Sequence, residues 1–89
     1  MLEYFVRRFE RYLESHGKRL SQMQRIVARI VFESDSSFTA EDICSSVKSA
    51  DPPIGRASVY RTLRFFEAAG LVTAFRRGGA CHYRVVGFG

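Results

Sequence analysis

A segment in the C-terminal half of the chain combines long hydrogen-bond donors with small side chains. If residues 56–69 form a helix, Val59, Leu63 and Phe66 lie within about 60° of one another and make its buried side. The opposite side of the helix, with the positions that flank it, then carries small residues and long hydrogen-bond donors: Ala57, Ser58, Tyr60, Arg61, Arg64 and Ala68. In a DNA major groove, arginine can donate two hydrogen bonds to guanine, and an aromatic edge can meet a thymine methyl group. The segment is therefore typical of a helix that reads base edges.

A second group of arginines is placed where it can reach a phosphate backbone. Arg76 and Arg77 immediately precede Gly78-Gly79, so they fall at the tip of a predicted loop and can contact phosphates or a minor groove. Arg19, in the segment before the second predicted helix, is a candidate for a similar contact, and Arg56 opens the fourth. The alternative for each is an ordinary solvated side chain.

The net charge of +5 is unevenly distributed. Residues 1–52 contain eight basic and eight acidic residues, whereas residues 53–89 contain six arginines and one acid, Glu67. Arginine's planar fork suits phosphate and guanine, so this asymmetry favours a nucleic-acid partner for the C-terminal half.

The periodicity of apolar residues defines the elements that hold these side chains. It predicts four helices, over residues 2–16, 21–33, 39–50 and 56–69. Residues 71–76 and 80–86, rich in Val, Phe, Tyr and Thr, flank the paired glycines and predict a two-stranded hairpin. This order is that of an α+β winged helix-turn-helix domain, with a short polar turn between the third and fourth helices and the hairpin as its wing.

Two helix starts have recognisable caps. Ser21 can cap the second helix, and Thr39 followed by Asp42 resembles a capping box at the start of the third.

The sequence contains no pattern typical of catalysis or metal binding. His16 and His82 have no partner at metal-site spacing, and we expect Cys44 and Cys81, which form no CxxC pair, to be small core residues. There is also no nucleophile with a nearby base, no phosphate-binding glycine loop and no paired carboxylates on one helix face. We therefore expect no enzyme activity, no catalytic or metal-ligating residue, no cofactor and no small-molecule substrate.

The chain also lacks the features of a membrane or secreted protein. No run approaches the roughly 18 apolar residues of a membrane span. The first residues, MLEYFVRRFERYLE, carry charges throughout and do not form a signal peptide. We expect a cytoplasmic protein with no membrane partner.

Residues 54–72, IGRASVYRTLRFFEAAGLV, resemble the ferric uptake regulator family. Ser58-Val59-Tyr60-Arg61 is similar to that family's TVYR, residues 38–42 (FTAED) resemble its segment opening the third helix, and residues 17–21 match in spacing. The resemblance covers nearly the whole chain. It implies a transcriptional regulator, usually a dimeric repressor of metal or peroxide genes, in which Tyr60 and Arg61 contact bases and Arg19 enters the minor groove.

The chain departs from the family pattern at several positions. Ser36 and Ser37 stand where the family often has histidine, and Arg84 stands where it has an acidic metal ligand. These departures weaken the expectation of metal sensing through the hinge positions. Gln24 replaces a commonly basic residue, a role that Arg25 can take.

Two functions follow as hypotheses. The first treats residues 1–89 as a single DNA-binding domain of a repressor, without the family's C-terminal dimerisation and metal domain, that binds double-stranded DNA weakly and self-associates on a two-half-site operator. The alternative is a protein-interaction module in which Tyr60, Phe65 and the arginines anchor an acidic partner without DNA binding.

Overall fold

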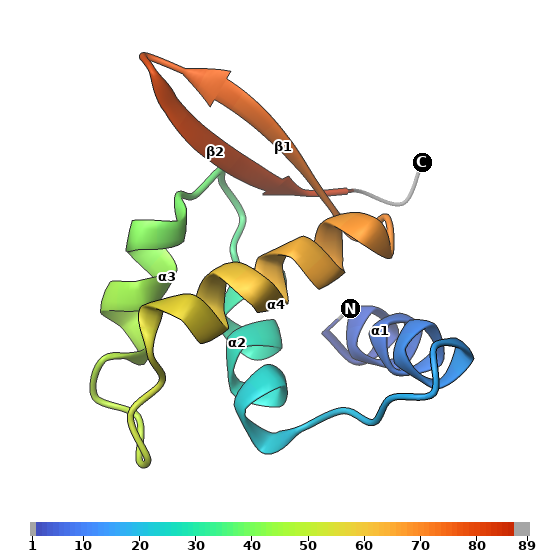
Figure 1. Ribbon diagram of the computed structural model, residues 1–89. Coiled ribbons are helices and arrows are strands. Elements are labelled where there is room, and N and C mark those ends of the chain that lie inside the picture. Colours follow the sequence, from blue (N-terminus) through green and yellow to red (C-terminus); the bar gives the residue numbers. More distant parts are fainter. Residues whose placement is uncertain (1, 87–89) are drawn as a thin grey trace.

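The computed structural model describes residues 2–86, which form helices followed by a hairpin (Figure 1). The elements in chain order are α1 (Leu2–Ser15), α2 (Gln22–Phe32), α3 (Ala40–Val47), α4 (Arg56–Ala68), β1 (Val72–Arg77) and β2 (Ala80–Val85). In Figure 1, α4 crosses α2, with α3 on one side and α1 on the other, and the hairpin projects beyond the helices. The predicted α+β winged helix-turn-helix fold is confirmed.

Aromatic side chains join α1, α2 and α4 at the centre of the domain. Phe5 stacks on Phe32 with ring centroids 5.0 Å apart, and Phe9 meets Phe66 edge to face at 4.7 Å. Phe32 also lies 4.8 Å from Phe66. All four rings are buried, so α1 contributes directly to the same core as the helix-turn-helix.

Both predicted helix caps are present. The Ser21 hydroxyl accepts from the Gln24 backbone N–H at 3.1 Å, and the Gln24 side chain accepts from the Ser21 backbone N–H at 3.0 Å. Thr39 and Asp42 make the same reciprocal pair, at 3.1 and 2.8 Å. Gln24 therefore has a structural task at the start of α2.

The third helix is shorter than predicted. It ends at Val47 rather than near residue 50, and an eight-residue connector, 48–55, replaces the short turn expected before α4. Ser46 donates its hydroxyl to the Asp42 carbonyl at 3.0 Å, a side-chain bond of the kind that weakens a helix end. Pro52 also disfavours helical geometry at the residue before it. The spacing of apolar residues in the sequence indicates neither the Ser46 hydrogen bond nor the influence of Pro52, so it predicted a longer helix.

The hairpin turns tightly and is tied to the helices. Gly78 and Gly79 have φ angles of 59° and 81°, the left-handed conformation that a two-residue turn of this type requires at both positions. Beyond the predicted strands, Phe38 in the connector before α3 forms an antiparallel bridge with Tyr83 of β2. This bridge fixes the wing against the segment that leads into the helix-turn-helix.

Candidate nucleic-acid interface

The buried side of α4 is as the sequence predicts, with one addition. Val59, Leu63 and Phe66 are fully buried, and so is Thr62. The Thr62 hydroxyl donates to the Ser58 carbonyl at 2.8 Å and lies 3.6 Å from the sulfur of Met23 on α2. A polar residue so satisfied can pack as a core residue, which its type did not indicate.

The exposed side of α4 presents the predicted donors to solvent. We call Ala57, Tyr60, Arg61, Arg64 and Ala68 the outer face of α4, and each of these five side chains is exposed. Within residues 2–86, Arg61 and Arg64 have no hydrogen-bond or ion-pair partner. Their guanidinium groups are therefore available to an external acceptor. Ser58 is half-buried beside this face.

One acid from α3 meets the start of α4. The Glu41 carboxylate forms an ion pair with Arg56, and its Oε2 atom lies 3.4 Å from the Tyr60 hydroxyl, which donates to it. Sequence reasoning missed Glu41. Its place in the first turn of α3 was visible, but its proximity to Tyr60 depends on how α3 packs against α4.

A groove of about 220 Å³ separates the outer face of α4 from the wing. It is lined by residues of α3, α4 and β2 and by the α3 cap: Thr39, Ala40, Glu41, Tyr60, Ala80, Cys81 and Tyr83. Cys81 is exposed beside this groove, so its predicted place in the core is wrong, whereas Cys44 is half-buried against the core. Cys81 lies on the same face of β2 as the buried Tyr83, but closer to the tip of the wing, which extends past the helices that would cover it.

The neighbouring Tyr83 has an unusual titration. Burial, together with a hydrogen bond to Cys81, raises the pKa of the Tyr83 hydroxyl to about 12. The hydroxyl therefore keeps its proton to a higher pH than that of an exposed tyrosine.

The two arginines at the wing tip have different surroundings. Arg76 donates from Nη2 to the Gly79 carbonyl at 3.0 Å, which draws its side chain back over the turn. Arg77 lies over the Phe75 ring, with Cζ 5.3 Å from the centroid, and Arg84 lies 5.2 Å from the same ring. Phe75, Arg77 and Arg84 lie on one face of the wing, because side chains alternate along each strand and the register pairs Ala74, the neighbour of Phe75, with Tyr83. This face points away from Tyr83.

Arg19 belongs neither to α4 nor to the wing. It is exposed in the connector between α1 and α2, beside Glu10 and Glu14 of α1 in a shallow groove. Figure 1 shows this connector entering α2 at the end farthest from the hairpin. Arg19 and the wing arginines thus come from elements other than α4.

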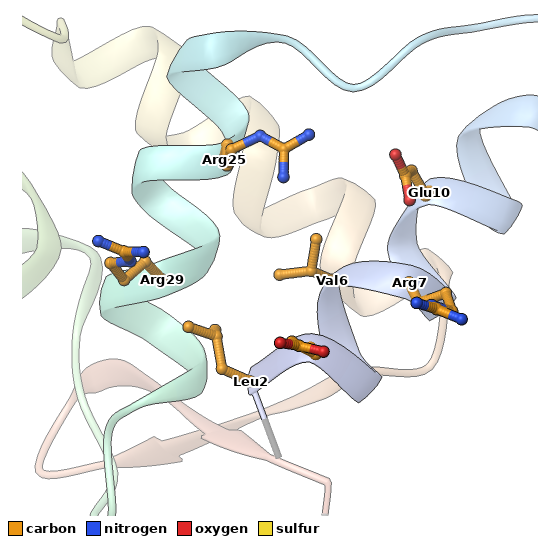
Figure 2. A pocket seen from close by; sticks show the side chains of 7 residues that line it. Leu2, Val6, Arg7, Glu10, Arg25 and Arg29 are labelled. Atoms are coloured by element: carbon orange, nitrogen blue, oxygen red, sulfur yellow. The ribbon is translucent and has the colours of Figure 1, made fainter.

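A second groove, between α1 and α2, contains Arg25 (Figure 2). Arg25 and Glu10 point toward one another across it, and Leu2 and Val6 lie deeper between the helices. Met23 faces α4, and a residue two positions later on a helix lies about 200° round the axis. Arg25 therefore lies on the side of α2 away from α4, next to α1. That it takes the role of the basic residue commonly found at the position of Gln24 stays a prediction.

The described residues contain neither a metal cluster nor a membrane span. No group of three His, Cys, Asp or Glu side chains within residues 2–86 is arranged to hold a metal ion. Over the same range, every helix falls short of the length and apolarity needed to cross a bilayer.

Phe65, the second aromatic of the protein-interaction hypothesis, is partly buried against the core, which leaves Tyr60 as the aromatic on the outer face.

Comparison with known proteins places the chain in a family. The model of the ferric uptake regulator family matches residues 15–87. A ferric uptake regulation protein of Campylobacter jejuni is 30% identical over 80 residues, covering 88% of this chain and 51% of that protein. One from Rhizobium leguminosarum is 30% identical over 78 residues, covering 86% and 55%. The chain thus spans about half the length of these curated relatives.

Solved structures agree with this result. The Helicobacter pylori ferric uptake regulator superposes with a TM-score of 0.84 at 22% identity, covering 96% of this chain and 57% of that one, and shows the fold. A manganese uptake regulator superposes at 0.73 with 29% identity, covering 89% and 59%. The chain therefore belongs to the ferric uptake regulator family, whose members are transcription regulators.

Proposed function

We propose that this chain is a sequence-specific DNA-binding domain of a transcriptional repressor, with α4 in the major groove and the wing on the sugar-phosphate backbone. The observation that carries the proposal is the outer face of α4, where Arg61 and Arg64 lack partners within residues 2–86 and Tyr60 is 39% exposed. Unpaired arginines beside small side chains suit bidentate contacts with guanine. Family membership supports the same role.

The proposed contacts divide by what they recognise. Tyr60, Arg61 and Arg64, with Ser58 beside them, are assigned to base edges. Arg76 and Arg77 at the wing tip are assigned to phosphates, and Arg56, at the first turn of α4, to the backbone nearby. Arg19, in the connector between α1 and α2, is assigned to the adjacent minor groove.

Several broader features are part of the proposal. Residues 1–89 act as one DNA-binding domain in the cytoplasm, with no enzymatic role. A single winged helix buries a small interface on DNA, so binding by one copy is weak and increases when two copies occupy adjacent half-sites. Sedimentation velocity with and without a two-half-site duplex tests this, because a stable dimer in the absence of DNA contradicts it.

The DNA-binding proposal is tested with duplexes enriched from a random library. Fluorescence anisotropy then compares Arg61→Ala with Arg77→Ala over a range of salt concentrations. Loss of Arg61 should reduce the preference for the enriched sequence, whereas loss of Arg77 should weaken binding to all sequences alike and lower the salt slope by about one. The proposal fails if the unaltered chain shows no salt-dependent duplex binding at micromolar concentration.

A further inference from the structure

The hydrogen bond between Tyr60 and Glu41 determines what the Tyr60 hydroxyl can offer to a ligand. Glu41 is a carboxylate and can only accept, so the 3.4 Å contact uses the single proton of the tyrosine hydroxyl. Arg56 binds the same carboxylate and holds it beside Tyr60. What Tyr60 still presents outward is the lone pairs of its oxygen.

We infer that Glu41 makes Tyr60 a hydrogen-bond acceptor and thereby a reader of exocyclic amino groups in the major groove. This inference rests on the proposed DNA-binding function. In that groove the amino groups are N6 of adenine and N4 of cytosine, whereas guanine and thymine present acceptors that a second acceptor repels. Tyr60 should therefore favour adenine or cytosine at the position it meets.

The surroundings of Glu41 argue against a purely structural role. The side chains of Arg56 and Glu41 are 60% and 58% exposed, and ion pairs at such exposure contribute little to folding stability. A carboxylate beside the outer face of α4 also repels phosphate, which lowers overall affinity for DNA. An acid at this place is understandable if it sharpens base selection.

Binding-site selection from a random duplex library tests the inference. The unaltered chain is compared with Tyr60→Phe, Glu41→Ala and the double variant. Glu67→Ala is the matched control, because it removes an exposed acid from α4 that does not hydrogen-bond Tyr60. Thermal melts establish that each variant is folded.

The unaltered chain should select adenine or cytosine at one position where Tyr60→Phe does not. Glu41→Ala should lose the same preference by roughly 3- to 10-fold, the value of one hydrogen bond, while Glu67→Ala keeps it. The double variant should resemble either single variant at that position. Both acid removals should raise binding to unrelated duplexes.

Other outcomes overturn the inference. It fails if Glu41→Ala or Tyr60→Phe selects the same motif as the unaltered chain, or if the position read by Tyr60 carries guanine or thymine. If the unaltered chain enriches no sequence at all, the proposed function fails and the inference falls with it.

Discussion

Phe38 and Tyr83 exchange two backbone hydrogen bonds, of 2.9 and 2.7 Å, and their rings stack with centroids 5.8 Å apart. The two residues lie in different parts of the chain, one before α3 and the other in β2. Their bridge connects the wing to the segment that leads into the helix-turn-helix. The spacing between the wing and α4 therefore depends on this contact as well as on the chain connection from α4 to β1.

Replacing Phe38 with alanine should destabilise the domain substantially. The side chain is 5% exposed, and truncating a buried phenylalanine typically costs about 3–5 kcal/mol. Urea unfolding followed by circular dichroism measures the change. Phe75→Ala, which truncates a half-buried ring on the outer wing, is the control and should cost much less. Equal losses would show that the bridge is not part of the cooperative core.

Alkaline pH should weaken the fold through Tyr83. Its pKa rises from 10.0 in the unfolded chain to about 12 in the folded one, so the folded state retains its proton more strongly. Stability from this group is complete below pH 10 and is lost as the pH rises toward 12, by on the order of 1–2 kcal/mol. Urea midpoints between pH 8 and 11.5 measure the slope.

Tyr83→Phe is the control for that slope, because other tyrosines and lysines titrate in the same range. Above pH 10, the unaltered chain should lose stability progressively relative to the Tyr83→Phe variant. Parallel curves across the whole range would contradict the assignment.

Arg56 and Arg64 should differ in their importance for DNA binding. Glu41 offsets the charge of Arg56, whereas Arg64 has no acidic partner within residues 2–86. Arg64→Ala should therefore weaken binding to the preferred duplex by about tenfold or more, within the roughly 1–3 kcal/mol expected for a good base contact. Arg56→Ala should weaken it less than Arg64→Ala does, because Glu41 already offsets part of the charge that the proposed backbone contact of Arg56 uses. Anisotropy titrations at one salt concentration compare them, and the reverse order would refute the pairing argument.

Removing the Thr39 hydroxyl should lower stability by about 1 kcal/mol. It caps the first turn of α3, and alanine at such a position leaves a backbone N–H without its acceptor. Thermal unfolding measures the loss. Thr73→Ala, at an exposed wing position, is the control and should have a smaller effect. A loss no larger than the control would indicate that water replaces the cap fully.

The helices and the buried side of α4 were predictable because they depend on local periodicity. Val59, Leu63 and Phe66 recur at helical spacing, and burial of all three follows directly. The paired glycines likewise determine where the hairpin turns.

Features that depend on packing between distant segments were not predictable in this way. Thr62 is buried because Met23 lies opposite, and Cys81 is exposed because the wing extends beyond its neighbours. Glu41 reaches Tyr60 only through the angle between α3 and α4. Single-residue preferences contain no information on such angles.

The aromatic contacts of α1 show that the folding unit starts at a different residue from the region matched by the family model. The family match begins at residue 15, yet Phe5, Phe9 and Leu13, all buried, come before it. A fragment trimmed to the matched region would leave the inner surfaces of Phe32 and Phe66 open to water and would be prone to aggregate. The smallest piece that folds therefore begins upstream of the region that the family model matches.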